Sequence, residues 1–230
     1  MLKIVQSPDP LLNQVCEPCE TGDRSLKKLA KQMERVMYAT DGVGIAAPQV
    51  GILKRLIVVE TTPDDEDGAR NPLALVNPEI IETWGDPEVN DEGCLSCPGI
   101  YVPIERQPWA RVRYQDFNGE EWEIESDGLL GRCLQHEIDH LNGITLFERA
   151  TPIVRITALK AYEEAKRLGA QPGDVSVAKL RVRSCESCTW EHRSWPPPSS
   201  RHWPPATRSW ACSRVRMPCA AAAAKSLPRP

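Results

Sequence analysis

Two histidines four residues apart constrain this chain more than any other feature. They enclose the pentapeptide His136-Glu137-Ile138-Asp139-His140, and this spacing stacks both imidazoles on one face of a helix. Both rings can then reach one metal ion, while Glu137 lies beside it and can move a proton to or from a water molecule on the metal. A pair of surface histidines is the simpler alternative. Burying two histidines and a glutamate without a partner is costly, so the pattern favours a metal site.

The flanking residues predict that this motif lies on a buried helix. Apolar side chains recur at helical spacing at Leu129, Leu130, Cys133, Leu134, Ile138 and Leu141. Asp127 is expected to cap this helix and Asn142-Gly143 to end it. Far upstream, the segment Glu92-Gly93-Cys94-Leu95-Ser96 offers the Cys94 thiolate as a third ligand. Two histidines and one cysteine leave a fourth position open, which is typical of a catalytic metal site.

Composition narrows the class of protein. The chain has 230 residues, a net charge of −4 and nine cysteines. We expect a cytoplasmic protein with no signal peptide, no membrane span and no direct nucleic-acid specificity. An odd number of cysteines in such a protein favours metal ligation or buried thiols over a disulfide framework. We interpret Cys16, Cys19, Cys97 and Cys133 as small core side chains or incidental thiols.

The pattern of residues predicts the order of helices and strands. Strands are expected at 55–60, 73–77, 79–84, 111–117 and 121–125. Pro78 is expected to separate two of these strands, and Asn118-Gly119 to form a hairpin turn. Besides the histidine helix, helices are expected from Ser25 as cap to Thr40, and from Thr151-Pro152 to Leu168. This order predicts an α+β fold, with mixed or antiparallel strands around a central metal-binding helix and helices at both ends.

Three segments together resemble the motifs of the peptide deformylases, which remove the N-formyl group from nascent bacterial proteins. Residues 42–49 match the loop G-x-G-x-A-A-x-Q, residues 92–96 match E-G-C-x-S, and residues 135–140 match Q-H-E-x-D-H. All three motifs are intact and in the expected order, which makes the resemblance highly specific. It covers about residues 1–169.

The resemblance implies a role for each motif residue. Cys94, His136 and His140 would bind one divalent metal, which is usually Fe(II) in this family, with nickel, cobalt or zinc able to substitute. Glu137 would be the general acid and base. The Gln49 side chain and the backbone N–H of Leu95 would donate hydrogen bonds to the oxyanion.

Supporting residues follow from the same resemblance. Asp139 would be buried against Arg106, although a solvated helix charge is the alternative. Glu92 would orient the metal site from behind its ligands. The methionine side chain of the substrate needs an apolar pocket, for which the candidates are Gly44, Ile45, Cys133 and Ile138.

Partners and competing functions complete the expectations. The resemblance implies N-formylmethionyl nascent peptides as substrates, action near the ribosome exit region, and a monomer. A zinc peptidase is a second hypothesis, although such enzymes usually take their third ligand from a downstream Glu or His. A third hypothesis is a deformylase-like protein that binds partners without catalysis. The intact Glu137 and Gln49 argue against it.

The composition changes near Leu180. Residues 1–180 are interpreted as the catalytic domain, and residues 181–230 as a disordered tail rich in Pro, Arg and Trp. There are two alternative interpretations of residues 181–230. One is a zinc knuckle formed by Cys185, Cys188 and His192, and the other is an RNA-binding segment. Residues 189–196 can be back-translated into GC-rich codons. When these codons are read in a shifted frame, they can encode Met-Gly-Thr-Pro-Glu-Leu-Ala, which resembles the start of methionyl-tRNA formyltransferase. We therefore interpret the tail as out-of-frame read-through.

Overall fold

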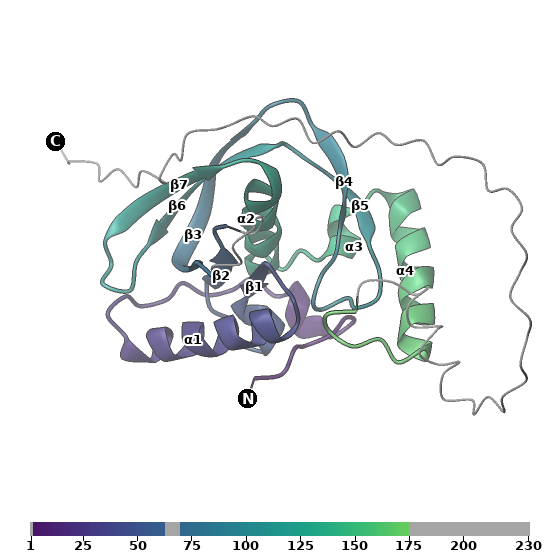
Figure 1. The fold of residues 1–230 in the computed structure, drawn as a ribbon, viewed down its shortest axis with the longest axis horizontal. Coiled ribbons are helices and arrows are strands. Elements are labelled where there is room, and N and C mark those ends of the chain that lie inside the picture. Colours follow the sequence, from purple (N-terminus) through teal and green to yellow (C-terminus); the bar gives the residue numbers. More distant parts are fainter. Residues whose placement is uncertain (1, 63–69, 175–230) are drawn as a thin grey trace, which may run out of the picture.

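The computed structural model describes residues 2–62 and 70–174, and Figure 1 shows how their helices and strands are arranged. The strands are β1 (Gly44–Ala46), β2 (Leu56–Glu60), β3 (Pro72–Trp84), β4 (Glu88–Glu92), β5 (Val102–Arg106), β6 (Trp109–Gln115) and β7 (Glu121–Ser126). The α-helices are α1 (Arg24–Ala39), α2 (Gly128–Leu141), α3 (Leu146–Arg149) and α4 (Pro152–Arg167), and the short 3-10 helices are η1 (Pro10–Asn13) and η2 (Ala47–Val50). The predicted α+β class is confirmed.

An antiparallel sheet in the order β1-β2-β3-β6-β7 lies between α1 and α2. β2 is apolar on both faces because each face is covered by a helix. Ile57 and Val59 belong to the core that includes Leu134 of α2, whereas Leu56 and Val58 belong to the core built on α1. Every residue from Cys133 to Leu141 of α2 is buried. The helix that carries the histidines is therefore the central helix of the molecule, as predicted.

A second, two-stranded sheet brings the upstream cysteine to α2. β4 and β5 pair with each other and lie toward the end of the molecule formed by α3 and α4 (Figure 1). Their core contains Val102 and Ile104 of β5, together with Phe147 and Tyr162 from α3 and α4. The segment 93–101, which connects β4 to β5, is thereby fixed between this core and α2.

Two expected boundaries differ from the structure. β3 continues through Pro78, where two separate strands were predicted. The register of β3 against β6 shifts between Val76 and Glu79, so Pro78 lies in a bulge, where its missing N–H breaks no regular ladder. The prediction that Ser25 caps the first helix was also wrong. Asp23 is the cap, and its carboxylate accepts a hydrogen bond from the Ser25 N–H at 2.7 Å.

The ends of the central helix agree with the sequence. α2 begins at Gly128 directly after Asp127, although the Asp127 side chain makes no capping hydrogen bond. It ends at Leu141, and Gly143 then adopts a φ of 73°, a conformation that glycine reaches without steric cost.

Within residues 2–62 and 70–174, no helix combines the length and apolarity needed to cross a bilayer. The predicted tail 181–230 and the domain boundary at Leu180 lie outside the described residues.

Candidate metal centre

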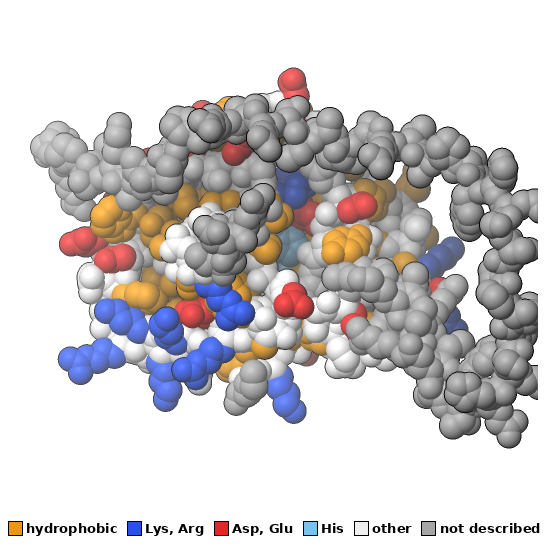
Figure 2. Space-filling view, viewed as in Figure 1, with side chains coloured by type: hydrophobic (Ala, Val, Ile, Leu, Met, Phe, Trp, Pro, Cys, Tyr) orange, Lys and Arg blue, Asp and Glu red, His pale blue; other side chains and the backbone are white. Residues whose placement is uncertain are grey.

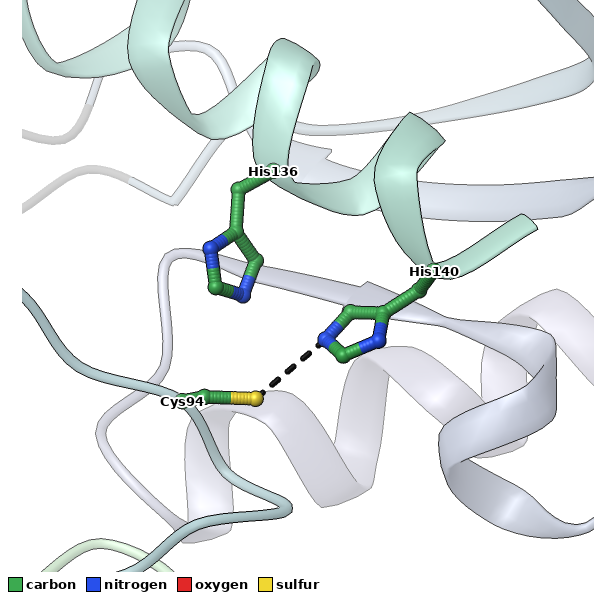
Figure 3. A group of neighbouring side chains, drawn as sticks. All are labelled: Cys94, His136 and His140. Carbon is green, nitrogen blue, oxygen red and sulfur yellow. Dashed lines mark hydrogen bonds between the residues drawn. The ribbon is translucent and has the colours of Figure 1, made fainter. Parts of the chain in front are cut away.

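Three potential metal ligands from two segments meet beside α2. His136 and His140 project from successive turns of α2 toward Cys94, which lies two residues beyond the end of β4 (Figure 3). The Cys94 Sγ atom is 3.2 Å from the His140 Nε2 atom, and one ligand atom of each residue lies within 4.8 Å of the others. Ligand atoms at ~2.0–2.3 Å from a tetrahedral ion are ~3.5 Å apart. The spacing of the three atoms therefore fits one metal ion.

Glu92 prepares His136 for metal binding. The Nδ1 atom of His136 lies 3.0 Å from the Glu92 Oε2 atom. An ionised carboxylate can only accept a hydrogen bond, so the proton of the neutral ring is on Nδ1. This leaves the lone pair of His136 Nε2 free, in the carboxylate–histidine arrangement that is common behind metal ligands.

Two buried polar atoms at the site have no hydrogen-bond partner. They are the His140 Nδ1 and Glu137 Oε2 atoms, and both are enclosed. Buried polar atoms without partners are rare in native proteins and point to a catalytic role, an ordered water or an ion. The His140 Nδ1 atom is the ring nitrogen that does not face Cys94. The Glu137 Oε2 atom, together with the spacing of the ligand atoms, supports the fit of a metal and of a reacting water at this position.

Electrostatics favours a thiolate at Cys94. A hydrogen bond from the Cys97 thiol holds the pKa of Cys94 well below its ordinary value, and the charge of His140 lowers this pKa further, against the effect of burial. A deprotonated cysteine is the form that binds metals.

Glu137 is the buried carboxylate of the site. Burial raises the pKa of Glu137 to about 7, and the charges of Cys94 and Glu92 also raise it, while those of His136 and His140 oppose the change. A carboxyl group with a pKa near neutrality can both accept and release a proton, as a general acid and base must.

Gly44 provides the space that Glu137 occupies. A Cβ atom at residue 44 would lie 2.5 Å from the Cys133 Sγ atom and 2.6 Å from the Glu137 Oε1 atom. Any side chain at Gly44 would therefore displace the catalytic candidate. Because Gly44 of the first motif has no side chain, β1 can pass directly beside the Glu137 carboxylate.

Two hydrogen-bond donors lie beside the same centre. The Gln49 Oε1 atom accepts from the Ala46 N–H at 2.8 Å, which fixes the orientation of the amide. Its Nε2 atom then donates toward the Cys94 Sγ atom at 3.4 Å. In the described part of the chain no group accepts the Leu95 N–H. One side-chain amide and one backbone N–H are thus available beside the ligands.

A network of ion pairs supports the ligands from behind. Arg106 donates to both oxygens of Glu92, at 2.6 and 3.0 Å, and to the Asp139 Oδ2 atom at 2.8 Å. The side chains of Arg106, Glu92 and Asp139 are at most 9% exposed. Asp139 is therefore buried and paired, as the resemblance implied, and Arg106 connects the end of β4 to α2.

Two further arginines join this network, and sequence reasoning missed both. Arg132 donates to the Glu92 Oε1 atom at 2.8 Å, and Arg149 pairs with Asp139. Arg132 could have been found, because it lies one helical turn before His136. The sequence contains no comparable signal for Arg149, whose position depends on the turn between α2 and α3.

A cavity of about 290 Å³ opens onto the ligands, and the space-filling view shows a histidine side chain, in pale blue, visible among apolar side chains on this face (Figure 2). Gly44, Gln49, Cys94, Leu95, His136 and Glu137 are among its lining residues. Apolar lining comes from Val43, Ile100, Tyr101 and Leu129. The side chain of Leu129 is 42% exposed, so the expectation that Leu129 belongs to the buried face of α2 was wrong.

The predicted pocket residues divide into two groups. Gly44 lines the cavity. Ile45 is fully buried in the core built on α1, whereas Cys133 and Ile138 are buried in the core between α2 and the sheet. The structure does not place these three side chains in the cavity wall, because strand and helix geometry turn them toward the core. The sulfur of Cys133 nevertheless contacts the backbone near Gly44, through a hydrogen bond to the Val43 carbonyl at 3.6 Å.

Comparison with known proteins gives a consistent result. The model of the polypeptide deformylase family matches residues 1–155. A peptide deformylase from Hahella chejuensis is 40% identical over 169 residues, which are 74% of this chain and 98% of that protein. A peptide deformylase from Thermodesulfovibrio yellowstonii is 42% identical over 166 residues, or 72% of this chain and 99% of that protein.

Solved structures agree with these relatives. The crystal structure of a peptide deformylase from Legionella pneumophila has a TM-score of 0.67 and 39% identity, and covers 74% of this chain and 97% of that one. A peptide deformylase from Synechococcus elongatus in complex with actinonin has a TM-score of 0.66 and 41% identity, and covers 72% of this chain and 88% of that one. The three motifs, the cluster of ligands for a divalent metal and these matches show that the chain belongs to the peptide deformylase family, metal-dependent hydrolases that remove the N-formyl group from nascent peptides.

Proposed function

We propose that this chain hydrolyses the formamide bond of N-formylmethionyl peptides, with Cys94, His136 and His140 as metal ligands and Glu137 as general acid and base. Formate and a free amino terminus are the products. The observation that carries the proposal is the meeting of three ligand atoms within 4.8 Å beside a buried carboxylate oxygen that has no partner.

The donor set suits a borderline divalent metal, and we infer Fe(II), with nickel, cobalt or zinc able to occupy the same ligands. When bound, such an ion supplies Lewis-acid polarisation of the carbonyl and lowers the pKa of a coordinated water toward ~7. The imidazoles of His136 and His140 and the thiolate of Cys94 would hold it and would leave a position open to substrate and water.

Glu137 moves the proton. Its carboxylate takes a proton from the attacking water and delivers it to the nitrogen of the departing amine, which could not otherwise leave as a neutral group. A pKa of about 7 lets the same side chain perform both transfers near neutral pH. The absence of a side chain at Gly44 keeps Glu137 in position for them.

Gln49 and Leu95 stabilise the negative charge that develops on the formyl oxygen. The Gln49 amide is already oriented by its hydrogen bond from Ala46, so it needs no rearrangement during the reaction. Removing one preorganised donor of this kind typically costs about 3–4 kcal/mol of transition-state stabilisation.

The cavity receives the substrate. The formyl group must lie at the ligands, and the methionine side chain then occupies apolar lining such as Val43, Ile100 and Leu129. We retain Gly44 as a contact residue. Ile45 and Cys133 would act indirectly, by supporting the wall from the core.

The remaining assignments are functional expectations. The substrate leaves the ribosome as a growing chain, so we expect this enzyme to act near the exit region, in the cytoplasm and as a monomer. Residues 1–180 would suffice for catalysis, without residues 181–230.

Formate release from a formyl-Met-Ala peptide tests the proposal. The full chain should be purified without oxygen and loaded separately with Fe(II), Ni(II), Co(II) or Zn(II). We expect one metal per chain, formate release, and inhibition by actinonin, the ligand of the Synechococcus elongatus structure. Cleavage of the Met-Ala bond without formate release would contradict the proposal and support a peptidase.

A further inference from the structure

A second thiol lies directly beside the proposed metal ligand. Cys94-Leu95-Ser96-Cys97 is a C-x-x-C segment, and its last cysteine lies beyond the E-G-C-x-S motif. The Cys97 N–H donates to the Cys94 carbonyl at 2.9 Å, so these four residues form a turn. Cys97 is not one of the metal ligands described above, and its thiol donates a hydrogen bond to Cys94.

The turn brings the two cysteines within range of each other. The end residues of a β-turn have Cα atoms less than about 7 Å apart, and disulfides bridge Cα separations of about 4.4–6.8 Å. Cys97 belongs to the core around β5, α3 and α4, and Cys94 packs against this same core. The two side chains are therefore on the same side of the turn.

The two thiols differ in their access to solvent. Cys94 lines the cavity, whereas Cys97 is fully buried and does not line it. A small oxidant that enters the cavity can reach the sulfur of Cys94 but not that of Cys97. Such an arrangement pairs an attacked cysteine with a resolving one.

We propose that Cys94 and Cys97 form a reversible disulfide when a peroxide reaches the metal-free site. Cys94 attacks one oxygen of hydrogen peroxide, the O–O bond breaks, and a sulfenic acid and one water form. The sulfur of Cys97 then attacks the Cys94 sulfur, and the hydroxyl group leaves with the Cys97 proton as a second water. The two thiols together lose two electrons and two protons, and the peroxide is reduced to two waters.

The disulfide would act as a protective state of the metal site. It removes the third ligand, so the oxidised chain cannot hold the metal through Cys94. It also stops oxidation before the sulfinic and sulfonic acids, which thiols do not reverse. A reductant restores Cys94, and the site can bind metal again. Bound metal occupies the same sulfur and therefore competes with the oxidation.

The sequence allows a direct readout by mass. Trypsin releases residues 71–106 as one peptide in which Cys94 and Cys97 are the only cysteines. The full chain should be treated with hydrogen peroxide after chelation, or after loading with Zn(II), which has no redox chemistry of its own. We expect the peptide from the chelated protein to lose two hydrogens and to resist alkylation until it is reduced. Zinc loading should prevent this change.

The chain contains an internal control with the same spacing. Cys16 and Cys19 are the only cysteines of the tryptic peptide 4–24. Both are buried, but the Cys19 N–H donates to the Asn77 side chain instead of closing a turn onto Cys16. This pair should remain reduced under the same treatment.

The variants Cys97→Ser and Cys97→Val distinguish disulfide formation from oxidation of Cys94 to its sulfinic or sulfonic acid. Neither variant removes a metal ligand, and Cys97→Ser also keeps a hydroxyl donor toward Cys94, so both should still take up zinc before oxidation, Cys97→Val less tightly. Their melting curves show whether they are folded. After peroxide, the 71–106 peptide of either variant should gain two or three oxygens, and zinc binding should not return on reduction. The wild-type chain should recover its full zinc content.

Two results would overturn the inference. One is a wild-type peptide that gains oxygens as fast as the variants do, without a form that lacks two hydrogens. The other is a disulfide that links Cys94 to a different peptide, such as the one that carries Cys133. Neither result depends on deformylase activity, so failure here is distinct from failure of the proposed function.

Discussion

Replacing Arg106 by methionine should strongly destabilise the fold, because the methionine leaves two buried carboxylates without their shared partner. Burial alone would raise the pKa of Glu92, but hydrogen bonds from His136 and Arg106 lower it from 4.5 to about 2. Each pKa unit corresponds to about 1.4 kcal/mol, so the ionised form of Glu92 is stabilised by roughly 3 kcal/mol. Removing one partner of a buried ion pair lowers the free energy of unfolding by about 3–5 kcal/mol. We expect a loss in this range.

The sign of the pH dependence follows from the same shift. The folded pKa of Glu92 lies below its unfolded value, so its contribution is complete above about pH 4.5 and is lost as the pH falls toward about 2. The difference between wild type and Arg106→Met should therefore be largest near neutral pH and should shrink on acidification through this window.

Equilibrium urea denaturation of the metal-free proteins measures this effect. Arg111→Met is the matched control, because Arg111 also contacts two carboxylates, Glu82 and Glu125, but at the surface. Exposed pairs contribute little, so the control should unfold close to wild type. If Arg106→Met were no less stable than Arg111→Met at neutral pH, the reasoning about the buried network would be refuted.

Three other changes test separate parts of the account. Cys94→Ala should empty or severely weaken the metal site, and tight stoichiometric binding in a metal analysis would show that Cys94 is not the third ligand. Gly44→Ala should retain the metal but lose most formate release, because the new Cβ would lie 2.6 Å from the Glu137 Oε1 atom; unchanged turnover would remove this argument. A chain that ends at Leu180 should keep both its rate of formate release and its melting temperature, and a large loss of either would show that residues 181–230 are functional.

Local patterns predicted much of the fold. Helical spacing and the flanking Asp127 and Asn142-Gly143 located α2 to within a residue at each end. The apolar run of β2 was recognised because both faces of this strand are buried. β4 was not, since four of the five residues of Glu88–Glu92 are polar and the one apolar residue, Val89, is exposed. It is a strand because it pairs with β5, and its own residues lack the apolar alternation by which a strand is recognised in a sequence.

The site was predictable where the chemistry requires particular residues in a fixed order. The ligands, Glu137 and Gln49 all come from motifs. The wall of the cavity was harder to predict, because sequence spacing does not show whether Ile45 or Cys133 faces the core or the opening. The role of Arg149 was also hidden, since it pairs with Asp139 across the turn between α2 and α3. Arg132 was overlooked, although it lies one helical turn before His136.

The central claim is that Glu137 moves the proton at a metal held by Cys94, His136 and His140. Glu137→Gln tests this most directly, because it keeps the size of the side chain and removes its basicity. Metal content and formate release should be measured on the same anaerobic sample, beside wild type. We predict one metal per chain, as in wild type, with nearly all turnover lost. Near-normal formate release from the metal-loaded variant would contradict the account.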